Sequence, residues 1–301
     1  MHANFALLGM DVGPDLGKRG PASDLLYYDK REGGVTRTWV HPAGFPDKVQ
    51  PMVQAIATSE FAVFYPGSLD RFAGEQILAL DMMGVRTGVL SHPPEVDAGR
   101  LESMIRGTVL EGYSRAEPGG IREAVLGIRP VTAPGPPRAV ITQSFDVRGV
   151  GTVLLGNVTS GVIRQYDKMV VHPAGTEVLV KSIQVHDEPV PEAPAPARVG
   201  LAVKGVSPDE VSRGDVLAAE AAVSGAVELD YEPCRFYKGD LAAGSGCVAC
   251  IGAQAMGAQV SSVSPVSLDL SRPAVCEPGQ VVLLLRPESD GARIIGSGRI
   301  R

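Results

Sequence analysis

The first 130 residues alternate short apolar runs with stretches in which apolar residues recur every three or four positions. The runs predict buried strands and the periodic stretches predict amphipathic helices. Alternation of the two is typical of a parallel α/β domain. The Gly33-Gly34 pair predicts a turn between strands, and Gly84 predicts the end of a helix. We expect strands at 5–8, 25–28, 35–40, 61–65, 85–90 and 109–110, and helices at about 47–57, 72–83, 96–105 and 121–128.

The pattern changes after Pro130-Val-Thr-Ala-Pro-Gly-Pro-Pro137, a segment whose proline content predicts a linker. Phe145–Ile163 then combines short β-branched runs with four glycines, which indicates strands joined by tight turns, as in a small closed barrel. Strand-like runs continue to the end of the chain. We therefore predict an α/β domain at 1–130, a linker at 131–138, a β-barrel at 139–220 and a C-terminal β-barrel at 226–301.

Composition narrows the classes of function. The chain is 44% hydrophobic and 21% charged, as in an ordinary globular protein, and its net charge is −6. An acidic balance argues against nucleic-acid binding through bulk charge and leaves room for a local basic patch. Since no apolar run is as long as a membrane span, we expect no membrane partner and a cytoplasmic location.

All four cysteines lie in the last quarter of the sequence, and Cys247 and Cys250 form a C-x-x-C pair. This spacing is half of a zinc site, or a redox pair. A zinc site needs a second pair of ligands, and the five histidines are distant in sequence. Buried core cysteines are the favoured reading, and we expect no metal; the role of Cys247 and Cys250 stays open.

A glycine-rich stretch with a Gly-Lys pair follows the first predicted strand. A phosphate-binding loop requires G-x-x-x-x-G-K-[ST], with backbone N–H groups around the phosphates and a hydroxyl on Mg²⁺. Here Gly13 and Gly17 are one residue too close, and Arg19 follows Lys18 in place of the hydroxyl residue. Pro14 also removes an N–H donor. We interpret the stretch as a vestigial nucleotide loop.

The order of domains resembles the translational GTPases, with elongation factor Tu, the selenocysteine-specific elongation factor and the gamma subunit of the archaeal initiation factor as the nearest kinds. The resemblance rests on a motif of the second domain, F-x-V-x-G-x-G-T-V-x-x-G-x-V-x-x-G-x-I. Its positions here are Phe145, Val147, Gly149, Gly151, Thr152, Val153, Gly156, Val158, Gly161 and Ile163.

Two later segments extend this resemblance. Val199–Val206 and Arg213–Leu217 are similar to the closing pattern of the family's second domain. The stretch from Cys234 to Val260, together with Ile294-Ile-Gly-Ser-Gly298, is similar to the family's third domain. The resemblance implies a degenerate P-loop-GTPase-like α/β domain followed by two β-barrels of the domain 2 and domain 3 type.

The nucleotide motifs of the family are altered. Where the family has D-x-x-G and a histidine that positions water, this chain has His41-Pro-Ala-Gly44-Phe45. The imidazole of His41 does not replace a metal-side carboxylate, and the phenyl ring of Phe45 does not orient water. Ser91-His-Pro-Pro-Glu95 stands in place of the guanine-reading N-K-x-D, and no switch threonine is identifiable. We expect no hydrolysis and no bound cofactor, although GTP and Mg²⁺ stay possible.

The resemblance predicts a non-catalytic translation-factor-like protein that binds tRNA, another RNA or the ribosome through its barrels. We interpret Gly149, Gly151, Thr152, Gly156 and Gly161 as structural, since glycine acts on backbone geometry. Gly13, Gly17, Lys18 and Gly44 are the vestigial nucleotide residues. Candidate RNA contacts are basic residues of the second domain: Arg148, Arg164, Lys168, Lys204 and Arg213.

Two alternatives remain open. The Gly17-Lys18 pair is compatible with a genuine GTP-binding factor that has atypical motifs. The proline-rich stretch Pro189-Val-Pro-Glu-Ala-Pro-Ala-Pro196 would project as a stiff extended loop and favour a regulatory module that docks onto a protein.

Overall fold

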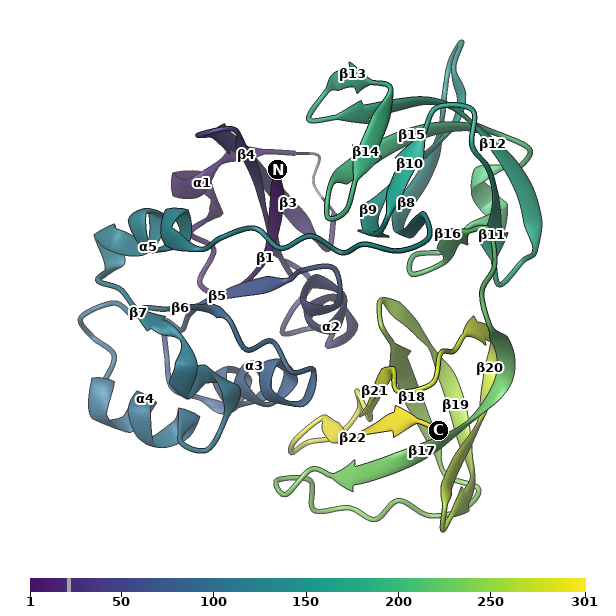
Figure 1. The fold of residues 1–301 in the computed structure, drawn as a ribbon. Helices are drawn as coiled ribbons and strands as arrows, with labels where there is room; N and C mark the ends of the chain where they lie inside the picture. The colour runs from purple at the N-terminus through teal and green to yellow at the C-terminus, as the bar shows by residue number, and fades with distance from the viewer. Residues whose placement is uncertain (21–22) are drawn as a thin grey trace.

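The computed structural model describes residues 1–20 and 23–301, and it contains an α/β domain and two β-barrels (Figure 1). This architecture confirms the predicted fold class of an α/β domain followed by barrels of the domain 2 and domain 3 type. In Figure 1 the first domain lies on one side of the molecule and the two barrels lie on the other, one above the other. The domain boundaries stay predictions.

The first domain is built on a seven-stranded sheet in the order β2-β3-β4-β1-β5-β6-β7. Strands β4, β1, β5, β6 and β7 are parallel, whereas β2 and β3 are antiparallel additions at one edge. Gly33 and Gly34, both with positive φ, form the two-residue turn between β3 and β4. The strands are β1 (His2–Gly9), β2 (Lys18–Arg19), β3 (Leu26–Glu32), β4 (Val35–His41), β5 (Phe61–Tyr65), β6 (Gly88–Leu90) and β7 (Ser114–Arg115).

Helices cover both faces of this sheet, because alternate residues of its strands are apolar and buried. Leu8 and Phe64 point to a core shared with α2, α3 and α4, whereas Phe5 and Val63 point to a second core shared with α1 and α5. The helices are α1 (Gly13–Leu16), α2 (Gln50–Ala57), α3 (Arg71–Met82), α4 (Ala98–Ile105) and α5 (Ile121–Gly127). Gly84 has φ +72 after the end of α3, as its predicted cap role requires.

Some expected elements were wrong. Val109–Gly112 is a 3₁₀ turn and not a strand, because the Thr108 hydroxyl accepts the Leu110 N–H and Asp81 accepts the Val109 N–H. The last strand of the sheet is β7 instead. The strand expected at 85–90 is shorter, since only Gly88–Leu90 pairs with β5. Further 3₁₀ turns lie at Pro118–Gly120 and Pro208–Glu210.

The second domain is a barrel in which β11-β16-β8-β9-β15-β12 close into a ring through the pairing of β12 with β11. Its interior is filled by aliphatic side chains such as Val158, Val180 and Leu217. The strands are β8 (Arg138–Val147), β9 (Gly151–Ser160), β10 (Val162–Arg164), β11 (Lys168–His172), β12 (Thr176–Val185), β13 (Glu188–Val190), β14 (Glu192–Pro194), β15 (Arg198–Lys204) and β16 (Val216–Ala218).

The proline-rich stretch at 189–196 does not project as a stiff loop, and that expectation was wrong. Its residues form β13, which pairs with β12, and β14, which pairs with β10. Ala193 and Ala195 are buried in the core of the second domain. The alternation of proline with small buried alanine is what lets the segment lie along the barrel.

The third domain is a closed barrel in the order β17-β20-β19-β18-β21-β22. Its four cysteines are buried and free of disulfides. Among the described residues, no group of three or more His, Cys, Asp or Glu side chains is placed to hold a metal ion. The strands are β17 (Val223–Pro233), β18 (Gly246–Ile251), β19 (Gln254–Val263), β20 (Val266–Val275), β21 (Val281–Leu285) and β22 (Ile294–Ile300).

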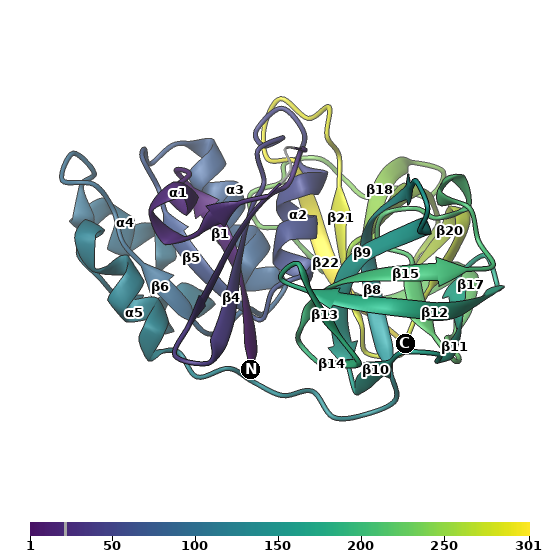
Figure 2. The same ribbon diagram turned by 90° about the horizontal axis from the view of Figure 1, so that it is seen from above.

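Helix α2 joins the three domains, and it lies between the sheet and the barrels in both views (Figures 1 and 2). The Gln54 side-chain amide donates to the Ala253 carbonyl of the third domain and accepts from Arg213 of the second. The Thr58 carbonyl accepts from Asn157. These contacts fix the first domain against both barrels. Within residues 1–20 and 23–301, no helix is long and apolar enough to cross a membrane.

Candidate nucleic-acid interface

The predicted nucleotide loop after β1 has an unusual shape. Gly13 begins α1, which is only four residues long, and Gly17 continues in an extended conformation into β2. A side chain on Gly17 would stand 2.9 Å from the Asp29 carbonyl oxygen, so glycine here allows β2 to approach β3 closely. Lys18 is therefore exposed on a short strand instead of at the start of a long helix.

The space above Gly13 is filled by the protein itself. A Cβ on Gly13 would meet the Tyr28 ring at 2.2 Å, and the Tyr28 hydroxyl donates to Asp11 at 2.6 Å. The other Asp11 oxygen accepts the Gly13 N–H at 3.0 Å. An N–H group that a phosphate would need is thus already bonded to a carboxylate, which would repel a phosphate.

The residues at the place of the D-x-x-G loop have roles in packing. The His41 ring lies 3.1 Å from the Leu7 carbonyl oxygen, and burial lowers its pKa below the ordinary value. Phe45 packs edge-on against Phe72 at 5.8 Å. The Gly44 N–H donates to the Asp24 carbonyl. This loop supports the sheet and the domain interface.

The segment after β6 borders a cavity of about 310 Å³ at the ends of β6 and β7. Arg115 and Glu102 form a two-contact ion pair in its wall, at 2.8 and 3.0 Å. The His92 ring lies 2.9 Å from the Pro93 carbonyl, and Ser91 is buried. The cavity's arginine already has a carboxylate partner, and Glu117 adds a negative charge to the described lining, so the cavity does not favour a phosphate.

A different feature stands out where β2 faces the second domain. Here a groove of about 630 Å³ separates Lys18 and Arg19 from the strands of the barrel. The barrel wall presents Phe145, Val147 and Val150, which are 40%, 36% and 39% exposed. Apolar side chains with this much exposure in one place mark a surface that another molecule covers.

The cations of this groove differ in their partners. Arg198 is held by Asp29 at 3.0 Å, and its guanidinium lies 4.2 Å from the centre of the Tyr27 ring. In the part of the chain that the structure describes, Lys18 and Arg19 take part in no ion pair and are exposed. The groove therefore combines an apolar wall with two available positive charges.

The candidate RNA contacts predicted in the second domain are scattered. Arg148 lies exposed in the turn after β8, near the groove's apolar wall, and Lys168 and Lys204 are exposed elsewhere on the barrel. Arg164 pairs with Glu192 at 3.1 Å. The structure does not bring these four together.

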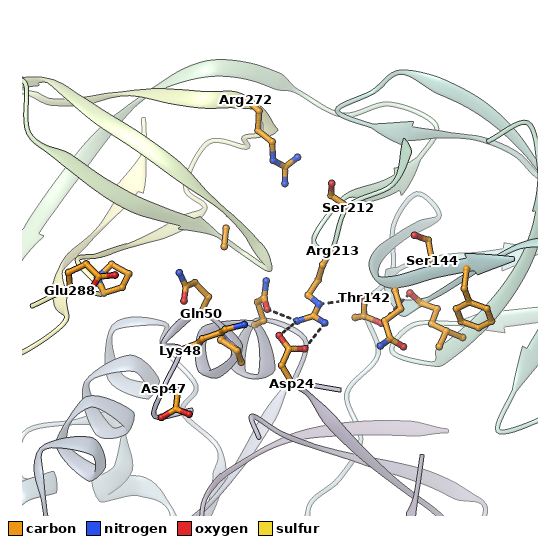
Figure 3. A pocket seen from close by; sticks show the side chains of 17 residues that line it. Asp24, Asp47, Lys48, Gln50, Thr142, Ser144, Ser212, Arg213, Arg272 and Glu288 are labelled. Carbon is orange, nitrogen blue, oxygen red and sulfur yellow. Dashed lines mark hydrogen bonds and ion pairs between the residues drawn. The ribbon is translucent and has the colours of Figure 1, made fainter. Parts of the chain in front are cut away.

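Arg213 differs from these, because it fastens the second domain to the first. Its guanidinium bonds both oxygens of Asp24, at 2.7 and 2.9 Å, and the Thr142 carbonyl at 3.2 Å (Figure 3). Hydrogen bonding to Arg213 lowers the pKa of Asp24. Arg213 is a structural residue of the domain interface in this conformation.

Figure 3 shows the cavity of about 1120 Å³ that these residues line between the three domains. Its second arginine, Arg272, pairs with Asp215 at 3.3 Å. Lys48 shares the lining with Asp47 and Glu288. Positive and negative charges are balanced here, so the cavity attracts an anion less than the groove does.

The glycines of the barrel motif have two kinds of environment. Gly149 and Gly151 have φ of +82 and +97 in the tight turn between β8 and β9, with open space around them. Side chains on Gly156 and Gly161 would stand 2.4 Å from the carbonyl oxygens of Val140 and Gly135. Their assignment as structural residues stays an interpretation that this geometry supports.

Thr152 belongs to the same motif. Its hydroxyl donates to the Val206 carbonyl at 2.8 Å and lies 3.2 Å from Asp146. This bond ties β9 to the segment after β15.

Comparison with known proteins identifies this architecture. Residues 151–218 match the family model described as elongation factor Tu domain 2. Elongation factor 1-alpha of Archaeoglobus fulgidus is 47% identical over 81 residues, which cover 27% of this chain and 19% of that protein. Translation elongation factor SelB of Methanococcus maripaludis, solved with the GTP analogue GppNHp, shares the fold with a TM-score of 0.82 at 18% identity, covering 99% of this chain and 78% of SelB.

The second barrel thus matches elongation factor Tu domain 2, and the whole chain shares the three-domain fold of SelB. The chain belongs to one family with an uncharacterised protein of Methanocaldococcus jannaschii, to which it is 31% identical over 298 residues, 96% of either chain. Its fold and second barrel are those of a translation factor.

Sequence reasoning missed the groove and the neighbours that close the nucleotide loop. Arg19 was noticed only as a misplaced hydroxyl residue, and Tyr28 only as part of a strand. The alternation of β3 could have placed Tyr28 on the same face as Leu26. No sequence signal reveals that β2 lies opposite Phe145, because that contact joins different domains.

Proposed function

We propose that this protein is a translation-factor-like RNA-binding protein that holds a single-stranded end of tRNA, or ribosomal RNA, in the groove between β2 and the second barrel. The observation that carries the proposal is the position of Lys18 and Arg19 opposite the exposed side chains of Phe145, Val147 and Val150.

This combination has the chemistry that single-stranded RNA requires. Exposed aromatic and aliphatic side chains give an unstacked base a surface to lie on, and nearby cations neutralise its phosphates. Phe145 supplies the aromatic ring, and Lys18 and Arg19 supply cations that form no ion pair among the described residues. Of the two carboxylates in the lining, Asp29 is held by Arg198, and Asp187 is the other. A small groove of this kind is compatible with a chain whose net charge is −6.

The relatives support the choice of partner. Their names describe elongation factors, which are factors of translation. We therefore infer tRNA or the ribosome as the partner.

We further propose that the protein does not hydrolyse GTP. The support is local: Tyr28 and Asp11 occupy the space and the N–H at Gly13, and α1 is too short to provide a phosphate site at its start. Isothermal calorimetry with GTP and Mg²⁺ tests this part, with no measurable heat expected. Micromolar binding would restore the alternative of a genuine GTP-binding factor.

The RNA proposal is tested by fluorescence anisotropy with labelled tRNA, aminoacylated or deacylated, and with ribosome co-sedimentation. Lys18→Glu and Arg106→Glu make the same change in net charge, and exposed Arg106 at the end of α4 does not line the groove. We expect Lys18→Glu to weaken binding about tenfold or more and Arg106→Glu to leave it within about twofold.

A second variant tests the apolar wall. Phe145→Ala should weaken binding by about 1–3 kcal/mol if a base lies on the ring. The proposal fails if the wild-type protein binds neither tRNA nor ribosomes at low salt, or if Arg106→Glu costs as much affinity as Lys18→Glu.

A further inference from the structure

A small buried cavity lies on the far side of the first domain, between β3, β4, α1 and α5. It has about 10 Å³ of space for the centre of a water-sized sphere, which is room for one water molecule or one small ion. Its floor is formed by Arg37 and Trp39 of β4, and α5 covers it with Arg122, Val125 and Leu126.

Two hydrogen-bond donors in its lining have no partner among the described residues. These are the Nε of Arg37, a residue only 5% exposed, and the indole N–H of Trp39, which is 2% exposed. Arg37 makes one hydrogen bond, from Nη2 to the Leu126 carbonyl at 3.3 Å. Leaving buried donors without an acceptor is costly, so this geometry calls for an acceptor between them.

The charges around the cavity are mostly positive. Lys30 lies directly opposite Arg37 in the antiparallel pair of β3 and β4. Like charges at directly opposed positions destabilise a sheet. Arg122 adds a third cation, and the single carboxylate of the lining, Glu32, lies 2.8 Å from Arg122 and 3.9 Å from Lys30.

Arg37 itself has no carboxylate within 4.0 Å in the part of the chain that the structure describes. Burial lowers the pKa of its guanidinium below the ordinary value, and the more distant charge of Glu32 opposes this. A buried cation without a close counter-ion is unfavourable unless an anion joins it.

We propose that this cavity binds a halide-sized anion such as chloride, held by the guanidinium of Arg37 and the indole N–H of Trp39. An anion accepts hydrogen bonds and donates none, which matches the two N–H donors that have no partner. A water molecule would also have to place two hydrogens of its own. The acceptors in the lining are already engaged, Glu32 by Arg122 and the Leu126 carbonyl by Arg37, and Leu16 and Val125 are apolar. The bound anion would join α5 to the sheet just before the chain leaves for the second domain.

Trp39 is the only tryptophan, so its fluorescence reports directly on the cavity. Protein dialysed into sodium gluconate is titrated with sodium bromide at constant ionic strength, and quenching of Trp39 is recorded. Because the ring is buried, free bromide in solution should quench it little. We expect saturable quenching, relieved by chloride, and a Tm about 2 °C or more higher in chloride than in gluconate.

Arg37→Met should abolish both effects, and so should Trp39→Phe in the Tm assay. The matched control is Arg31→Met, which removes an exposed cation from the opposite face of β3 and should keep both effects. If Arg37→Met does not fold, the wild-type titration and a bromide anomalous-scattering map decide. Linear or absent quenching, equal Tm in the two salts, or a water in the cavity overturns the proposal.

Discussion

A buried ion pair between Glu75 and Arg293 joins the first and third domains beside their shared apolar core, and its removal tests how the domains are held together. Arg293, in the segment between β21 and β22, places its Nη2 2.6 Å and its Nε 3.1 Å from the oxygens of Glu75 on α3. The two side chains are 8% and 3% exposed. Arg293 also donates to the Pro46 carbonyl at 2.6 Å.

Glu75→Gln keeps the shape and removes the charge, which leaves the Arg293 guanidinium buried without its counter-ion. Removing one partner of a buried ion pair typically costs about 3–5 kcal/mol. Replacing both partners with apolar residues, Glu75→Leu with Arg293→Met, avoids the lone charge. We therefore expect the double variant to lose less free energy of unfolding than the sum of the two single variants.

Urea unfolding followed by two probes measures this. Fluorescence of Trp39 reports on the first domain, and far-ultraviolet circular dichroism reports on the helices and strands of all three domains. In the wild type we expect the two transitions to coincide, because the domains share one apolar core that includes Cys250 and Leu283. In Glu75→Gln the Trp39 transition should move to lower urea. A cost below about 1 kcal/mol for Glu75→Gln, or strict additivity in the double variant, would refute the reasoning.

Three further predictions concern other parts of the chain. Burial raises the pKa of Glu60 to about 7, so the stability that the protonated carboxyl contributes is present below about pH 4.5 and is lost as the pH rises to 7. Between these pH values the free energy of unfolding of the wild type should fall by up to about 3 kcal/mol more than that of Glu60→Gln, and urea unfolding at each pH measures the difference. Gly156→Ala should prevent folding of the second barrel, because its Cβ would clash with the Val140 carbonyl oxygen. Gly149→Ala meets only backbone strain at positive φ and should cost about 1–2 kcal/mol of stability. Thermal melts followed by circular dichroism compare the two variants, and equal costs would contradict the clash with Val140. Lys18→Glu should also reduce the slope of log affinity against log salt for RNA by about 0.7 or more, and an unchanged slope would mean that Lys18 touches no phosphate.

Local chemistry explains why much of the fold could be predicted from the sequence. The turn at Gly33-Gly34 and the cap at Gly84 need positive φ, which glycine adopts without strain, so their positions follow from residue type alone. The glycine-rich motif from Phe145 onward likewise predicted the second barrel. Proline misled the prediction at 189–196, because composition indicates an extended chain and does not say whether it pairs with a barrel strand.

The candidate site was less predictable. The sequence predicted Lys18 as part of a vestigial nucleotide loop and Arg213 as a candidate RNA contact. Asp24, its partner, is 189 residues away along the chain. Contacts between domains leave no periodic pattern in the sequence of either domain. The sequence around a charged side chain therefore does not show whether a residue of another domain pairs with it.

The sequence by itself determined the order of the three domains, the second barrel and the altered nucleotide motifs, since these depend on residue spacing and backbone conformation. Only the tertiary structure decided which cations are available. It buried Arg293 against Glu75 and bonded Arg213 to Asp24, and it left Lys18 and Arg19 facing the apolar wall of Phe145. The reason is physical: an arginine's charge acts through the groups within a few ångströms of it, and folding alone sets which groups those are.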